Sequence, residues 1–321
     1  MPCIIMSAVA MLSERGMAEP VYAKVIVNPR AGAGATAKRW PRVKEALRQS
    51  GVRFDYELTE APGHATELAR IAVGEGYKLV VSVGGDGTMN EIVNGLYKLG
   101  ADSDVMLGII STGTGSDYIR SLGIPRSFKD ACQRLYKPEK KVVDLGMVEY
   151  MANGQKVKRI FVNFTGLGFD AEVVKIITQR FKFLGGTLFY LVGVLACLML
   201  NRNKNITLNI DGEISERSVR EVLVCNGKYG GGGMIPAPDA DVADGLLDVL
   251  IIDNASKADL LWSLPRIYKG THLTHPKVTV KKARKIEIDA GDELLVQADG
   301  ELLGKAPARL WVLPAALTVA V

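Results

Sequence analysis

The chain has 321 residues, of which 48% are hydrophobic and 23% are charged, and its formal net charge at pH 7 is +5. These values describe a globular protein with enough residues for about two domains, and they argue against a nucleic-acid-binding protein, whose positive excess would be far larger. A small positive excess suits phosphate ligands or an anionic membrane surface.

The sequence carries no targeting or zinc-binding pattern. Residues 1–20 are mostly apolar but lack the positive charges that begin a signal peptide, so we expect a disordered extension. The four cysteines are scattered without paired spacing, which indicates reduced thiols of a cytoplasmic protein and argues against structural zinc. His272 and His275 lie in a connecting segment, and we expect both of them at the surface.

Residues 21–140 alternate between strands and helices. The continuous apolar run Leu79–Val83 is typical of a buried parallel strand. The alternation predicts an α/β domain with a parallel sheet flanked by helices on both faces. The predicted strands are Tyr22–Val27, Phe54–Leu58, Leu79–Val83 and Met106–Ile110, and the predicted helices are Lys38–Arg48, Ala65–Glu75, Met89–Lys98 and a short one near Tyr118.

Residues 141–321 have a different texture, with short β-rich runs separated by proline, glycine and aspartate. We therefore expect a second, β-rich domain that packs on the first. Helices are expected only around Val173–Leu200 and over Lys257–Tyr268. The predicted strands are Val142–Val148, Arg159–Phe164, Asn205–Ile210, Val219–Cys225, Leu246–Ile252, Lys285–Ile288, Leu294–Ala298 and Arg309–Val312.

The segment Leu184–Leu200 consists of 17 uncharged and mostly apolar residues. This length is the lower limit for a helix that crosses a membrane, and the segment has equal positive charge on its two flanks. We therefore expect a helix that is buried in the protein or lines an apolar cleft.

The strongest motif is Gly84–Thr88, with the sequence GGDGT, between a predicted buried strand and a helix. Ligands bind at the carboxyl ends of strands in open α/β sheets, glycines let the backbone approach a phosphate, and the following helix offers free N–H groups. Asp86 can serve a metal–phosphate complex. Two more small-residue loops, Asn28–Gly34 and Gly113–Asp117, follow the first and fourth strands, so the three loops together predict one phosphate site.

Competing motifs are less specific. The segment that begins at Gly32 fits the dinucleotide pattern G-x-G-x-x-A, and Asp55 lies about where its ribose-binding acid should, but Gly166–Ala171 fits the pattern as well. The phosphate-binding signature of P-loop NTPases and the H-R-D and D-F-G signatures of protein kinases are both missing, which excludes these two classes.

Two acidic clusters lie in the second half of the chain. Asp239, Asp241 and Asp244 fall within six residues ahead of an apolar strand, in a turn that can either bind a hard cation or be solvated. The second cluster, Asp299-Gly300-Glu301, follows a predicted strand and by itself has the composition of an ordinary hairpin turn.

Seven segments form an ordered set: NPRAG, GGDGT-x-NE, GTGSD, VVDLG, NFTGLGFDAEV, APDADVADGLLDV and ADGE. This set resembles the bacterial diacylglycerol kinase catalytic-domain family, which contains lipid kinases and has sphingosine kinases as eukaryotic relatives. The resemblance covers about residues 22–321. It implies an ATP-binding domain over residues 21–140, a β-sandwich domain for the lipid substrate over residues 141–321, and an active site between them.

The resemblance also implies roles for individual residues. Asp299 and Glu301 match the segment that supplies the proton acceptor in relatives. A structural Mg²⁺ site is implied at Asp241, Asp244 and Leu246. The implied nucleotide contacts are Asn28, Pro29, Arg30, Ala31, Gly32, Thr59, Gly84, Gly85, Asp86, Gly87, Thr88, Met89, Asn90 and Thr114, with Asp117 and Asp144 joining a water network to the catalytic magnesium.

One position departs from the family pattern. The loop after the fourth strand usually has asparagine where this chain has Ser116. Serine donates or accepts a hydrogen bond through one hydroxyl, whereas asparagine has a separate donor and acceptor. We therefore expect a difference in activity or nucleotide preference, and an inactive homologue stays an alternative.

The sequence thus predicts an ATP- and Mg²⁺-dependent kinase that phosphorylates the hydroxyl of diacylglycerol or a related lipid. Asp86, Asp117 and Asp144 would organise Mg²⁺, and Asp299 with Glu301 would accept the proton of the hydroxyl. The alternatives are an NAD-kinase-like enzyme for a soluble metabolite and a non-catalytic lipid-binding homologue. We expect a cytoplasmic protein that associates peripherally with the inner membrane face and has no nucleic-acid partner; a homodimer is left open.

Overall fold

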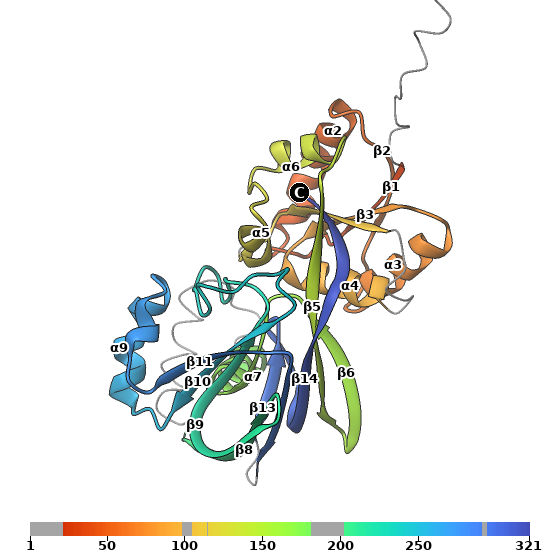
Figure 1. Ribbon diagram of the computed structural model, residues 1–321. Coiled ribbons are helices and arrows are strands. Elements are labelled where there is room, and N and C mark those ends of the chain that lie inside the picture. Colours follow the sequence, from red (N-terminus) through yellow and green to blue (C-terminus); the bar gives the residue numbers. More distant parts are fainter. Residues whose placement is uncertain (1–21, 98–104, 114, 181–201, 291–293) are drawn as a thin grey trace, which may run out of the picture.

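The computed structural model describes residues 22–97, 105–113, 115–180, 202–290 and 294–321. They form an N-terminal domain of strands and helices and a C-terminal domain made mainly of strands, with two long strands running between them (Figure 1). This division confirms the predicted pairing of an α/β domain with a β-rich domain. Residues 1–20, the segment Leu184–Leu200 and Thr114 lie outside the described residues.

The N-terminal sheet is formed by four strands whose neighbours run parallel. The strand β1 (Tyr22–Val27) pairs with β2 (Arg53–Leu58) on one side and with β3 (Leu79–Gly84) on the other, and β3 pairs with β4 (Met106–Ser111). Since β1, β3 and β4 are almost fully buried, both faces of the sheet must be covered. One face packs against α2 (Ala35–Gln49) and α6 (Phe128–Arg134), and the other against α3 (His64–Gly74), α4 (Asp86–Tyr97) and α5 (Asp117–Leu122).

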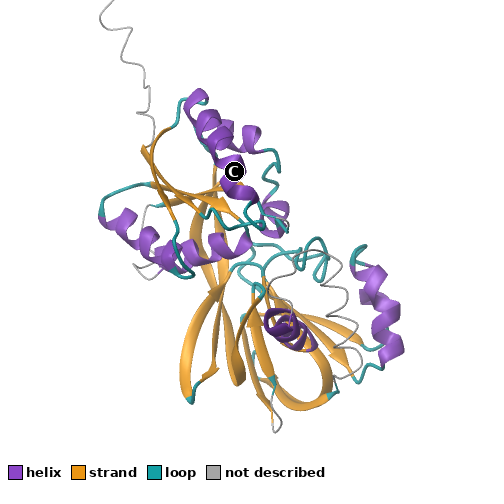
Figure 2. Cartoon of the chain, turned by 180° about the vertical axis from the view of Figure 1, so that it is seen from behind, coloured by secondary structure: helices purple, strands orange, loops and turns teal. Residues whose placement is uncertain are grey.

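The C-terminal domain is an antiparallel barrel. Strands pair in the closed order β7-β9-β8-β12-β14-β13 and back to β7, and β10 and β11 extend the sheet from β9. Aliphatic side chains fill its interior. The strands are β6 (Gln155–Phe161), β7 (Phe164–Gly168), β8 (Lys204–Ile210), β9 (Glu213–Cys225), β10 (Leu247–Asp253), β11 (Val278–Ala283), β12 (Lys285–Ala290) and β13 (Leu295–Ala298), and α7 (Phe169–Arg180), α9 (Lys257–Ile267) and the 3-10 helix η1 (Thr271–Thr274) pack on this domain (Figure 2).

Two long strands, β5 (Lys140–Ala152) and β14 (Glu301–Ala320), run through both domains (Figure 1). They pair antiparallel along most of their length. At its end, β14 adds to the N-terminal sheet, where Thr318 and Val319 pair in parallel with β4. The last strand of the chain therefore belongs to both domains and holds them together.

Some elements differ from those that the sequence predicts. The single strand expected at Arg159–Phe164 is divided into β6 and β7, because the backbone N–H groups between them bond to a side chain instead of a neighbouring strand. The helix α6 and the strand β11 were not predicted, since each buries only one or two residues and shows no hydrophobic period. Among the described residues, no helix is both long and apolar enough to cross a membrane.

Candidate active site

The loops after β1, β3 and β4 meet at one edge of the N-terminal sheet, because these parallel strands all end there. Asn28 Nδ2 donates a hydrogen bond of 2.9 Å to Thr88 Oγ1, which ties the first loop to α4. The N–H of Gly113 donates to the carbonyl of Gly84. A Cβ atom on Gly113 would lie 2.7 Å from the Cα of Gly85, so only glycine allows this approach of two backbones. The structure thus brings the three small-residue loops together.

Asp86 is the first residue of α4, where the helix leaves backbone N–H groups without partners inside the helix. Those N–H groups and the helix dipole favour a bound anion. Asp86 Oδ2 accepts a hydrogen bond of 2.9 Å from the N–H of Ser116, so the carboxylate also links two of the loops. A carboxylate beside an anion site is suited to a cation that bridges phosphate oxygens.

Ser116 adopts a left-handed backbone conformation with a φ of 57° immediately before α5. Asparagine visits this region more readily than serine does. The Ser116 hydroxyl lies 2.6 Å from the hydroxyl of Ser111. The serine thus makes a short polar contact at the position where the family pattern has an asparagine amide. The departure from the family pattern therefore lies at a position where the backbone, and not only the side chain, prefers asparagine.

Two side chains of α2 support the loop after β4, and sequence reasoning missed both. Thr36 Oγ1 lies 2.6 Å from Thr112 Oγ1, and Arg39 donates a 3.1 Å hydrogen bond to the carbonyl of Thr112. Neither belongs to a motif, so the sequence contains no signal for them. The predicted contact Thr59 follows β2, and its N–H donates to the carbonyl of Val27 at 2.8 Å, beside the start of the first loop.

Asp299 of the C-terminal domain contacts the N-terminal domain through Asn90 of α4. Its Oδ2 accepts hydrogen bonds of 2.7 Å from both Asn90 Nδ2 and the N–H of Val162, and its Oδ1 accepts from the N–H groups of Asn163 (3.0 Å) and Phe164 (3.1 Å). Burial raises the pKa of Asp299 to about 6, although these hydrogen bonds favour the ionised form and act against the rise. The carboxylate is therefore charged at neutral pH and joins the two domains.

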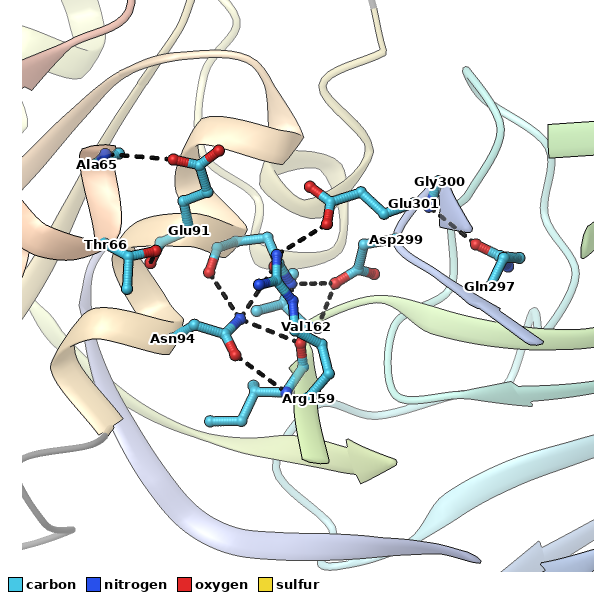
Figure 3. Close-up of polar contacts among 12 residues, drawn as sticks. Ala65, Thr66, Glu91, Asn94, Arg159, Val162, Gln297, Asp299, Gly300 and Glu301 are labelled. Atoms are coloured by element: carbon cyan, nitrogen blue, oxygen red, sulfur yellow. Dashed lines mark hydrogen bonds and ion pairs between the residues drawn. The ribbon is translucent and has the colours of Figure 1, made fainter. Parts of the chain in front are cut away.

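Glu301 reaches the same junction through Arg159 (Figure 3). The Arg159 guanidinium donates to Glu301 Oε2 at 2.9 Å and to Asn90 Oδ1 at 3.1 Å. Asn94, one turn after Asn90, donates to the carbonyl of Ile160 at 3.2 Å and accepts from its N–H at 3.1 Å. Sequence reasoning missed Arg159 and Asn94. The spacing of Asn90 and Asn94, which places two amides on one face of a helix, is the signal that could have revealed Asn94.

The two acids expected to join a magnesium water network lie in different places. Asp117 accepts a 2.7 Å hydrogen bond from the N–H of Gly232, and burial raises its pKa with a further contribution from the charge of Asp86, so it lies near the loop edge. Asp144 is buried, and its oxygens accept 2.7 Å hydrogen bonds from the N–H groups of Gly245 and Ala315. Asp144 therefore holds the acidic turn and β14 in place.

The acidic turn that was predicted to hold a structural Mg²⁺ has an internal cation. Lys282 Nζ lies 2.6 Å from Asp244 Oδ2 and 3.3 Å from Asp248. Asp241 and Asp244 each accept a hydrogen bond from a backbone N–H two residues later, the second of these being the N–H of Leu246. Within the described ranges, no three His, Cys, Asp or Glu side chains are grouped to hold a metal ion. As folded, a lysine ammonium is paired with Asp244, so a Mg²⁺ ion would have to displace it to bind that carboxylate.

The C-terminal domain contains an apolar cavity of about 330 Å³. It lies between the face of β9 that bears Glu221 and Leu223 and the helix α9. Phe164 forms part of its wall, and the backbone N–H of the same residue bonds to Asp299, so the cavity adjoins the domain junction. Gly230 and Met234 also line the cavity, and Gly232, the partner of Asp117, lies between them in the sequence. The cavity is thus connected by neighbouring residues to the loop edge as well.

Two buried polar side chains, Glu221 and His272, line this apolar space together with the partly buried Asp170. Glu221 Oε2 accepts from the N–H of Asp170 at 2.5 Å, while Oε1 has no hydrogen-bond partner among the residues that the structure describes. Burial and then the charge of Asp170 raise the pKa of Glu221 well above its usual range, and burial lowers the pKa of His272. His272 was expected at the surface, and this was wrong: its Nε2 bonds to the carbonyl of Pro236 at 3.1 Å within the fold.

Two family models match the chain. The diacylglycerol kinase catalytic domain matches residues 22–148, which hold the three loops. The YegS C-terminal NAD kinase beta sandwich-like domain matches residues 163–321, which hold the cavity and Asp299. The boundary between the two matches falls in the region of β5 and β6.

Known proteins resemble the chain over nearly its full length. It is 29% identical to the diacylglycerol kinase of Bacillus subtilis (strain 168), over 89% of this chain and 91% of the relative. It is 30% identical to the diacylglycerol kinase of Mycobacterium tuberculosis (strain H37Rv), over 92% of this chain and 93% of the relative.

Solved structures share the fold. The crystal structure of a diacylglycerol kinase from Bacillus anthracis superposes with a TM-score of 0.69 at 22% identity, over 94% of this chain and 97% of that one. Yeast NADH kinase in complex with NADH superposes with a TM-score of 0.51 at 11% identity, over 94% and 83% of the two chains. From its sequence matches, the chain belongs to the bacterial diacylglycerol kinase catalytic-domain family and is a kinase.

Proposed function

We propose that the protein is an ATP- and Mg²⁺-dependent lipid kinase that transfers the γ-phosphate of ATP to the hydroxyl of diacylglycerol or a related lipid. Family membership supports phosphoryl transfer, and the three converging loops support a nucleotide phosphate site. The observation that carries the choice of acceptor is the apolar cavity beside Asp299, because a polar nucleotide acceptor has no use for it.

A lipid would place its acyl chain in the cavity and its hydroxyl at the domain junction. Each CH₂ group that leaves water for such a cavity gains about 0.8 kcal/mol. Phe164 connects the two parts, since its ring lines the cavity and its N–H holds Asp299. Glu221 Oε1, which has no hydrogen-bond partner within the described part of the chain, would bond a hydroxyl or ester group of the lipid.

Catalysis in this proposal depends on positioning and on charge neutralisation. The loops after β1, β3 and β4 would hold the phosphates of ATP, from Asn28–Gly32 and Gly84–Asn90, with Thr59 and Thr114 as further contacts. Mg²⁺ would be held mainly by the phosphates together with Asp86, which is how this ion is commonly bound in kinases, and Asp117 would orient its waters. The ion would supply charge that offsets the negative phosphates.

Asp299 would accept the proton of the lipid hydroxyl while the hydroxyl oxygen bonds to the γ-phosphorus and ADP leaves. An ionised carboxylate has about four acceptor positions, and Asp299 already uses four. Three of its donors are backbone groups, so we propose that the Asn90 amide gives way to the substrate. Glu301 would hold Arg159 beside this position.

A second candidate is a kinase for a soluble dinucleotide, because the fold is also that of yeast NADH kinase. A third is a lipid-binding homologue without catalysis, which the serine at position 116 suggests. One experiment separates the three: phosphate transfer from labelled ATP with Mg²⁺ to a panel of diacylglycerol, phosphatidylglycerol and NAD in detergent. We expect transfer to a lipid. Transfer to NAD alone would favour the second candidate, and lipid binding without transfer would favour the third.

A further inference from the structure

The outer face of α9 exposes large apolar side chains. Leu261 is 50% exposed, Trp262 is 41% exposed, and Tyr268, directly after the helix, is 48% exposed. Single exposed apolar residues are normal, but three within eight residues form a patch that calls for a partner. The other two tryptophans of the chain, Trp40 and Trp311, are buried or partly buried. Tryptophan and tyrosine are enriched at the boundary between membrane and water, where one end of the ring is apolar and the other is wet.

The inner face of the same helix lines the apolar cavity. Leu260, Leu264 and Ile267 recur at helical spacing and contribute to the cavity wall. Tyr268 also contributes to the cavity wall, whereas Leu261 and Trp262 do not, so the helix has the cavity on one side and these two exposed side chains on another. Because a helix with its side chains is about 10 Å across, a surface that lay on the patch would be only that far from the cavity.

The charges around the patch are mainly positive. Between residues 256 and 277 the chain has four Lys or Arg residues and one acid, Asp259. Asp259 is engaged by the Ser256 cap and by Lys277, whose Nζ lies 2.7 Å away. The Arg266 guanidinium lies 3.5 Å from the centre of the Trp262 ring, so a partly exposed cation stacks on an exposed aromatic ring. This combination complements anionic lipid headgroups.

A second group of exposed aromatic residues has both acids and cations beside it. Tyr22 and Tyr56 are exposed at the edge of the N-terminal sheet, where the Tyr77 hydroxyl donates to Asp55 and the neighbouring Lys24 is paired with Glu57. Lys44 lies over the Tyr56 ring, so a cation accompanies this group as well, but the acids beside it would oppose an anionic bilayer. Exposed aromatic side chains with a cation therefore do not by themselves select α9; the apolar cavity behind the helix does.

We propose that the outer face of α9 is the surface by which the protein docks on an anionic bilayer, so that lipids can enter the cavity from the membrane. Leu261 and Trp262 insert at the interface, and Arg266 and Lys269 contact the headgroups. The proposal rests on the proposed function only in taking the docked lipid as substrate; docking itself requires no catalysis.

Sedimentation with phosphatidylcholine vesicles, with and without phosphatidylglycerol, tests docking in the absence of ATP. We expect the full chain to bind the anionic vesicles in a salt-sensitive way, the double variant Leu261→Ser/Trp262→Ser to bind about tenfold more weakly, and Arg266→Gln/Lys269→Gln to lose roughly fivefold per cation. The control is Ile214→Ser, which removes an exposed apolar side chain elsewhere in the same domain and should change nothing. Circular dichroism and thermal melting establish that each variant is folded.

Two results would overturn the proposal. One is equal vesicle binding by the folded Leu261→Ser/Trp262→Ser variant and the unaltered chain. The other is a change of oligomeric state in that variant with unchanged vesicle binding, since the patch would then join two copies of the chain. Phosphorylation of lipid dispersed in detergent is measured in parallel: it should persist in the double variant, and its absence from the unaltered chain would count against the proposed function instead.

Discussion

The loop edge of the N-terminal domain and the cavity of the C-terminal domain are built by opposite means. At the loop edge, backbone groups and small residues lie close together, and Asp86 remains partly exposed to water. In the cavity, large side chains form the walls, and burial raises the pKa values of Asp170 and Glu221, which disfavours charge there. One region is suited to a charged ligand held by the backbone and the other to an uncharged chain. Changes in each should therefore affect different steps of the same reaction.

The largest effect is expected at the loop edge. The variant Asp86→Ala should lower kcat by about 10³-fold, because it removes a carboxylate placed where charge must be balanced during transfer. The melting temperature should change little, since Asp86 contributes no core packing. Steady-state kinetics with ATP and lipid measure this, with Asp289→Ala, an exposed acid far from the loops, as the control. If folded Asp86→Ala kept its activity within a few-fold of normal, Asp86 and the loop edge would have no part in phosphoryl transfer.

Substitutions in the cavity should change the kinetic constants for the lipid and not those for ATP. Two residues of α9 form a matched pair: Leu264 lines the cavity and Leu261 does not. In detergent, Leu264→Gln should lower kcat/KM for a long-chain lipid by about tenfold, because an amide is then placed against the chain, while Leu261→Gln should be silent. Two extra CH₂ groups on the lipid should raise kcat/KM of the unaltered chain by up to about tenfold. Equal effects of the two substitutions, or no dependence of kcat/KM on chain length, would show that the acyl chain of the acceptor does not bind in the cavity.

The pH dependence tests the junction between the two regions. If Asp299, with a pKa raised to about 6, accepts the proton, kcat/KM should rise as pH increases through about 6 and then level off. The free energy of unfolding should change in the opposite direction. Because the pKa of Asp299 in the folded chain exceeds its ordinary value of 3.8, the contribution of Asp299 to stability is complete below about pH 4 and is lost as pH rises through about 6. The variant Glu301→Gln should retain the kinetic transition. Loss of the transition in that variant would make Glu301 the acceptor.

The acidic turn gives a smaller effect, on stability alone. We propose that Mg²⁺ can bind there only in competition with Lys282, whose ammonium lies on Asp244. Lys282→Met should therefore make the rise in melting temperature on adding Mg²⁺ larger than in the unaltered chain. Thermal melting over a magnesium series measures the difference, and Lys282→Met/Asp244→Ala is the control that should abolish it. An identical magnesium response in all three proteins would leave the turn as a lysine-neutralised loop.

The smallest effect concerns the backbone of the loop edge. Ser116→Asn should relieve part of the cost of a left-handed residue, which is about 1 kcal/mol, and raise the melting temperature by about 2 °C. Ser116→Gly should also remove the conformational cost but has no side chain to replace the contact with Ser111. A lower melting temperature for Ser116→Asn would show that the contact with Ser111 outweighs the backbone preference.

The same contrast explains what could be predicted from the sequence. The loops are short local motifs, so Gly84–Thr88 and its neighbours could be placed at one edge from the order of strands alone. Asn90 and Asp299 are 209 residues apart, and their contact follows only from how the domains pack. His272 lies among residues typical of a surface connector, yet it is buried against Pro236. The cavity is invisible to pattern reasoning because its walls come from five or more segments between Phe164 and Val278.

The shared strand β14 also constrains how the protein folds. Thr318 and Val319 supply the neighbour of β4, and in the sequence they follow all the other strands of the second domain. The β4 edge of the N-terminal sheet therefore stays open until β14 pairs with it, and a fragment that ended with β5 would present that edge to other chains. The first domain is therefore complete only when β14 is in place, which makes folding of the first sheet depend on a strand that also belongs to the second domain.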